Sequence, residues 1–94
     1  MAVTASWQTS GDYRLQLASD VDRDGMGCEL LDGQDNFIAE VFRCDSDRTL
    51  TVSGEFQGVP LAIVDWFVAQ SKRRLDPFED GTPLAAILTK PDET

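Results

Sequence analysis

Three aspartates at alternating positions are the residues of this sequence whose spacing comes closest to a chemical site. Asp20, Asp22 and Asp24 stand in the stretch DVDRDGMG, and Gly25 follows them directly. Carboxylates at alternate positions of a loop, followed by a glycine that permits a sharp turn, supply oxygen ligands to calcium by curling around the ion. The three aspartates are therefore the candidate metal ligands of the chain.

The second half of this stretch departs from a calcium loop. Its first six residues resemble the start of an EF-hand loop, whose twelfth position is a bidentate Glu. Here the twelfth residue is Leu31, the eighth is Gly27, and the flanks have strand patterns where an EF-hand has helices. Glu29 or Asp32 could add an oxygen, so a small calcium- or ligand-binding domain stays open as an alternative. We expect an acidic turn between two strands that holds no tight calcium.

The remaining residue types argue against an enzyme. The sequence has no histidine, which removes the commonest general base, the Ser-His and Cys-His pairs and the usual zinc ligands. Cys28 and Cys44 form no Cys-x-x-Cys pair, and the glycines form no phosphate loop. We therefore predict no enzymatic activity and no cofactor, and two reduced thiols that are not bonded to each other.

The elements that would position these residues follow from hydrophobic patterning. Stretches of strand type, joined by turn residues such as Asp32-Gly33, run over 13–17, 26–31, 37–44 and 48–56. Four short strands with short turns predict an antiparallel meander. A helix is predicted from Pro60, which suits the first helical position, to Asp76-Pro77, which ends it.

The predicted fold is a single α+β domain over residues 1–94, with a four-stranded antiparallel β-meander and one main helix packed on one face. The stretch TPLAAILTK (82–90) is compatible with a second, short C-terminal helix. The expected buried stripe of the main helix consists of Leu61, Val64, Phe67, Val68, Ser71 and Leu75. Its expected partners in the sheet are Tyr13, Leu15, Leu17, Leu50, Val52 and Phe56.

The charge balance restricts the class of partner. Seventeen acids against eight bases give a net charge of −9, which disfavours binding to nucleic acid or to an anionic membrane. In a meander, the turn containing Asp45 and Asp47 lies at the same end of the sheet as the 20–24 turn. These acids could pair internally with Lys72, Arg73 and Arg74 of the helix, or they could form a docking surface for a basic protein.

Trp66 marks a second candidate surface. On the helical wheel it lies opposite the expected buried stripe, together with Ile63, Gln70 and Arg73. The C-terminal segment could fold back and cover this face with Phe78, Leu84 or Ile87. Otherwise Trp66 is an anchor for a protein partner or for self-association, because tryptophan and arginine are over-represented at binding hot spots.

The run from Asp24 to Leu75, over half of the chain, resembles a pattern found in small bacterial proteins of no assigned activity. It carries an AEVF strand, an LTV strand and a Pro-Leu helix with Trp-Phe. In size, acidity and lack of catalytic motifs the chain is also similar to bacterial immunity proteins and antitoxins. The first residues have no signal-peptide pattern and the cysteines are few, so we expect a cytoplasmic, non-enzymatic, acidic protein-interaction module.

Overall fold

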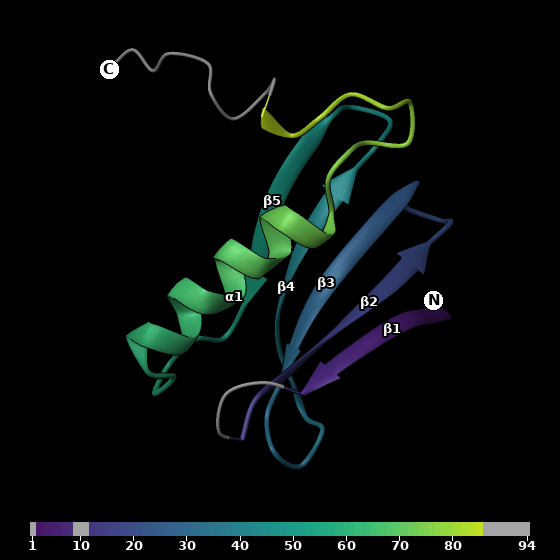
Figure 1. Cartoon of the computed structure of the whole chain (residues 1–94). Coiled ribbons are helices and arrows are strands. Elements are labelled where there is room, and N and C mark those ends of the chain that lie inside the picture. The colour runs from purple at the N-terminus through teal and green to yellow at the C-terminus, as the bar shows by residue number, and fades with distance from the viewer. Residues whose placement is uncertain (1, 9–11, 86–94) are drawn as a thin grey trace.

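The described residues of the computed structural model, 2–8 and 12–85, form a five-stranded antiparallel sheet with one helix across one face (Figure 1). Each strand pairs with its neighbours in chain order, as in a meander. The strands are β1 (Ala2–Gln8), β2 (Arg14–Asp20), β3 (Gly25–Leu31), β4 (Phe37–Cys44) and β5 (Thr49–Gly54), and the helix is α1 (Leu61–Arg74). The predicted α+β class, with an antiparallel meander and one main helix on one face, is confirmed.

Strand β1 is the main difference from the predicted sheet, which had four strands. It lies at the edge opposite β5 and pairs with β2, so that Trp7 stands opposite Leu15. In its sequence, AVTASWQ, the apolar residues Val3, Ala5 and Trp7 alternate with polar ones, but Ala5 is small and Ala2 falls out of phase, so the signal of period two is weak. Most of the short helix predicted over 82–90 lies outside the described residues.

The turn between β3 and β4 is shaped by an aspartate side chain. The Asp32 carboxylate accepts the backbone N–H groups of Gln34 and Asn36, both at 2.9 Å. Because these N–H groups favour the charged carboxylate, they lower the pKa of Asp32 below its ordinary value. The predicted hairpin at Asp32-Gly33 is therefore present and is fixed by side-chain capping.

Helix α1 begins one residue later than predicted. Pro60 is the N-cap, and its carbonyl accepts the backbone N–H groups of Ile63 (2.9 Å) and Val64 (3.1 Å). At the other end the Leu75 N–H donates to the Ser71 carbonyl at 3.0 Å, just before the Asp76-Pro77 pair. Within the described part of the chain, no helix is long and apolar enough to cross a membrane.

The buried row of α1 agrees with the predicted stripe at Phe67, Ser71 and Leu75 and departs from it at Ile63 and Leu61. Ile63, Phe67, Ser71 and Leu75 are buried at a spacing of four residues, whereas Leu61 is 74 % exposed. A row at this spacing forms one ridge of a helix surface, which can pack along a sheet. The prediction that Ile63 lies on the exposed face was wrong. Apolar residues occupy most of the circumference of this helix, so the contact with the sheet determines which row is buried.

The core lies between α1 and the central strands. Its buried cluster consists of Leu15, Cys28, Leu30, Ala39, Val41, Ile63, Phe67, Leu75, Phe78 and Leu84. Phe78 and Leu84, which follow the helix, are buried in this core, and the guanidinium groups of Arg43 and Arg48 lie over the Phe78 ring. The described part of the C-terminal segment thus folds back onto the core, whereas Ile87 lies outside the described residues. Val52 was expected in the core but is 56 % exposed, because β5 is an edge strand.

The strand register separates the two cysteines. Cys28 stands opposite Val41, and Cys44 stands opposite Gly25. The two thiols are therefore three residues apart along the strands, or about 10 Å at 3.3–3.4 Å per residue, which exceeds the reach of a disulfide. Both cysteines are free, as predicted, with Cys28 buried and Cys44 half-buried.

Candidate functional site

The aspartate stretch with the metal-like spacing forms the turn between β2 and β3, as predicted. The Asp20 carboxylate accepts the backbone N–H groups of Asp22 (3.1 Å) and Arg23 (3.2 Å) and pairs with the Arg23 guanidinium. The hydrogen bond from Arg23 lowers the pKa of Asp20. Among residues 2–8 and 12–85, no three His, Cys, Asp or Glu side chains gather where they could hold a metal. The first aspartate of the stretch is thus engaged in closing the turn.

The β2–β3 and β4–β5 turns meet at one end of the sheet, which we call the acidic end (residues 20–24 and 45–47). The Asp45 N–H donates to the Asp24 carbonyl at 2.9 Å, which confirms the predicted proximity of these turns. Asp22, Asp24 and Asp47 are exposed there. The acidic end therefore keeps several carboxylates in contact with solvent.

Arginines of the strands and turns neutralise other acids near this end. Asp45 pairs with Arg43 at 2.8 Å, and Arg48 pairs with Asp80. The sequence had predicted partners from the last turn of the helix. Arg43 and Asp45 pair because side chains two positions apart in an extended chain lie on the same side.

Arg43 also fastens the end of α1 to the sheet. Its Nη1 donates to the Leu75 carbonyl at 2.6 Å and to the Pro77 carbonyl. The side chains of Arg43 and Asp45 are 9 % and 7 % exposed. Asp45 is therefore held inside a buried ion pair, and this cluster stabilises the fold rather than presenting a charge to a partner.

Two buried carboxylates face each other on the side of the sheet away from α1. Glu29 and Glu40 are register partners, and Glu29 accepts from the Gln16 side-chain amide at 2.7 Å. Glu40 accepts two hydrogen bonds from Arg23, at 3.0 and 3.1 Å, and the Arg23 guanidinium lies 4.0 Å from the centre of the Phe42 ring. Both carboxylates are thus engaged by hydrogen-bond donors of the chain itself.

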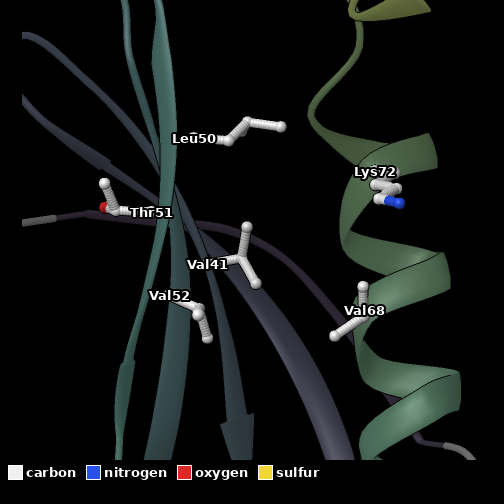
Figure 2. Close-up of a pocket in the computed structure, with 6 residues that line it drawn as sticks. All are labelled: Val41, Leu50, Thr51, Val52, Val68 and Lys72. Atoms are coloured by element: carbon white, nitrogen blue, oxygen red, sulfur yellow. The ribbon is translucent and has the colours of Figure 1, made fainter. Parts of the chain in front are cut away.

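An open cavity lies between β5 and α1, and Figure 2 shows the side chains around it. Its volume is about 230 Å³, and its walls are mainly aliphatic. It is lined by Val41, Leu50, Thr51, Val52, Val68 and Lys72. In Figure 2, Leu50 and Lys72 lie at one end of this groove, and Val52 and Val68 lie toward the other.

Strand β5, which forms one wall of the groove, is an edge of the sheet without the usual protection. It has a neighbour on one side, β4, and apart from Leu50 its residues are exposed. Edge strands are commonly blunted by Lys, Pro or other charged residues. The β5 sequence, TLTVSG, has no charged residue and no proline, in a chain of net charge −9. An open backbone edge therefore runs beside an apolar groove.

The helix residues predicted to bind a partner do not form one exposed face. Ile63 is buried, Trp66 is half-buried and packs against the core, and Arg73 is exposed. Gln70 is half-buried, and its Oε1 is buried without a hydrogen-bond partner in the described part of the chain. Together with Asp45, Ile63 belongs to the buried interior, and Asp47 and Arg73 remain the exposed members of the predicted set.

The groove itself was not predicted, although several of its residues had been singled out. Leu50, Val52 and Val68 were expected to be core residues, and they do face the space between sheet and helix. They stay accessible because β5 is the last strand of the meander and has no further strand beside it. The signal in the sequence that could have predicted the groove is an uncharged strand in the last position of a meander.

No protein-family model matches the chain, and no curated protein and no solved structure matches it. The geometry of the chain's own residues is therefore the basis for assigning a function.

Proposed function

We propose that this chain is a non-enzymatic protein-interaction module and that it binds an extended segment of its partner at β5. The observation that carries this proposal is the apolar groove beside the uncharged, exposed edge of β5. An edge strand offers a row of backbone hydrogen-bonding groups to an added strand, and a neighbouring groove can accept its side chains. Such a module can act as an inhibitor when the segment that it captures is needed by the partner.

The size and lining of the groove favour side chains over a whole small-molecule ligand. Pockets for drug-sized ligands have volumes of roughly 300–1,000 Å³ and combine apolar walls with several converging polar groups. This groove is smaller, at about 230 Å³, and the one charged residue among those that line it is Lys72. The absence of histidine from the sequence and the engagement of Glu29 and Glu40 within the sheet support a function other than catalysis.

The charge of the chain favours a basic partner. A net charge of −9 raises the rate of encounter with a positively charged protein and disfavours nucleic acid and anionic membranes. Asp22, Asp24 and Asp47 at the acidic end would contribute to this attraction. We place the module in the cytoplasm, which suits its two free cysteines.

Affinity capture from the native host tests the proposal with two matched variants. Val52→Asp puts a charge into the groove. Thr51→Asp puts the same charge on a neighbouring residue that borders the groove but whose side chain lies on the opposite side of β5 (Figure 2). The captured protein is then purified and titrated by calorimetry. We expect it to bind the wild type and Thr51→Asp and to lose at least about tenfold in affinity for Val52→Asp. Equal binding to both variants would refute the site.

A further inference from the structure

We infer that the groove takes the C-terminal segment of a partner chain, added antiparallel to β5 with its terminal carboxylate at Lys72. This inference rests on the proposed function and specifies the chemistry of the bound segment. It follows from three properties of β5 and α1: which backbone groups face the open edge, which side chains share the groove, and where the cation lies.

The backbone groups of Leu50 and Val52 face the open edge. The Glu55 N–H donates to the Ile38 carbonyl of β4 at 2.9 Å. In an antiparallel pair, hydrogen-bonding residues alternate along each strand, so Thr51 and the other odd-numbered residues of β5 bond to β4. The N–H and C=O groups of Leu50 and Val52 therefore point away from β4, where an added strand would meet them.

The side chains of the same two residues lie in the groove. Figure 2 shows Leu50 and Val52 on the side of β5 that faces α1, and Thr51 on the other side. Residues directly opposite each other in a sheet place their side chains on the same face. The two residues of an added segment that pair with Leu50 and Val52 would thus enter the groove, about 7 Å apart at 3.4 Å per residue. Aliphatic side chains match walls made by Val41 and Val68.

The position of Lys72 gives the segment its direction. Lys72 lies on α1, across the groove from Leu50, at the end of the groove where β5 begins (Figure 2). Its side chain is exposed, and in the described ranges 2–8 and 12–85 it has no ion pair. An antiparallel segment runs from Val52 towards Leu50, so its C-terminal end lies at the end of the groove that Lys72 lines. A parallel segment would place its N-terminal side there, and a free amine would repel Lys72.

The required chemistry is a carboxylate, which a chain terminus or an acidic side chain can supply. Two libraries of random hexapeptides separate these sources, one displayed with free C-termini and the other with C-termini blocked. We expect the free library to enrich peptides with aliphatic residues at alternate positions. Enrichment of an acidic residue in both libraries would assign the site to a side-chain carboxylate and overturn the terminal one, and enrichment in neither library would overturn the inference.

Variants of the enriched peptide and of the protein test the contact with Lys72. Fluorescence anisotropy should show that amidation of the peptide weakens binding roughly two- to fivefold, as expected for a partly exposed ion pair. Lys72→Met should weaken binding of the peptide with a free C-terminus by the same factor and leave binding of the amidated peptide unchanged. The neighbouring substitution Arg73→Met should change the binding of neither peptide. Equal effects of Lys72→Met on acid and amide would refute the contact.

Hydrogen exchange tests the strand addition independently. The bound peptide should slow the exchange of the Leu50 and Val52 amides, which face the open edge, and change that of Thr51 little. Absence of this alternation would overturn the inference. Sedimentation equilibrium tests whether a second copy of this chain occupies the β5 edge instead. A dimer that forms in the wild type and is lost in Val52→Asp would assign the edge to a second copy and overturn the inference. If a purified host protein still binds in a Val52-dependent way while every peptide fails, the proposed function stands and the inference about the segment falls.

Discussion

Replacing Arg43 with methionine should destabilise this protein more than any substitution at its acidic end. The Arg43 side chain is almost fully buried, donates to the carbonyls of Leu75 and Pro77, and forms an ion pair with Asp45 at 2.8 Å. Arg43→Met removes every donor and leaves a buried carboxylate and two helix-end carbonyls without their partner. Removing one member of a buried ion pair costs about 3–5 kcal/mol. A small domain has a total stability of about 5–15 kcal/mol, so this loss is a large share of it.

Urea unfolding at pH 7, followed by far-ultraviolet circular dichroism, measures this loss. Asp45→Asn is the matched comparison, because it removes the ion pair but leaves Arg43 its two carbonyl acceptors. We expect a smaller loss of unfolding free energy, about 1–2 kcal/mol, for Asp45→Asn, because asparagine keeps an oxygen that can accept from Arg43. A loss below about 1 kcal/mol for Arg43→Met, or a larger loss for the aspartate variant, would refute the view that Arg43 holds the end of α1.

Three further predictions concern a turn, a glycine and the thiols. The Asp32 pKa is lowered in the folded state. Its contribution to the free energy of unfolding is therefore present above the ordinary pKa of 3.8 and is lost as the pH falls below that value. Urea midpoints between pH 5 and pH 2.5 should therefore fall less steeply in Asp32→Ala, and equal slopes would contradict this. Gly54→Ala should cost about 2–4 kcal/mol by urea unfolding, because Gly54 has a φ of 138° and a Cβ there would overlap the β4 backbone. Gly58→Ala, with a φ of 79° and open space around it, should cost only about 1 kcal/mol, and equal costs would refute the steric part. Burial raises the pKa of Cys28, so a thiol reagent should modify Cys44 quickly and Cys28 only on unfolding; equal rates would contradict its burial.

The sequence predicted the meander well because its strands alternate and its turns carry strong local signals. Asp32 and Gly33 mark a hairpin through chemistry that acts within a few residues, and the structure has a turn there. β1 was missed because the small Ala5 at the middle apolar position and the out-of-phase Ala2 weaken the same alternation. Local patterns thus predicted a strand wherever its apolar side chains were large enough to stand out from the polar residues between them.

The row of α1 that packs on the sheet could not be read from the helix alone. Apolar residues surround most of this helix, so a buried row with Leu61 beside Phe67 was as consistent with the sequence as a row with Ile63 beside Phe67. The strands decide between them, and Leu61 is the residue left in solvent. Pairing of charges was equally non-local, since the count of acids does not tell which of them meets Arg43 or Arg48.

The candidate groove depends on which strand ends at the edge of the sheet. Leu50 and Val52 have the residue types of core positions, and their sequence pattern does not distinguish a covered strand from an open one. The openness follows from the order of five strands and from the position of α1 across them. Only the assembled sheet shows that an apolar face was left partly uncovered.

The order of the strands also bears on how fast this chain folds. Every strand pairs with its neighbours in sequence, from β1 to β5, and the connection between β2 and β3 is the short turn that follows Asp20. Short connections keep the entropy cost of loop closure small, and rates of two-state folding rise as contacts become more local. We expect this domain to fold faster than a sandwich of similar size whose strands pair across long connections, with successive hairpins forming before α1 docks.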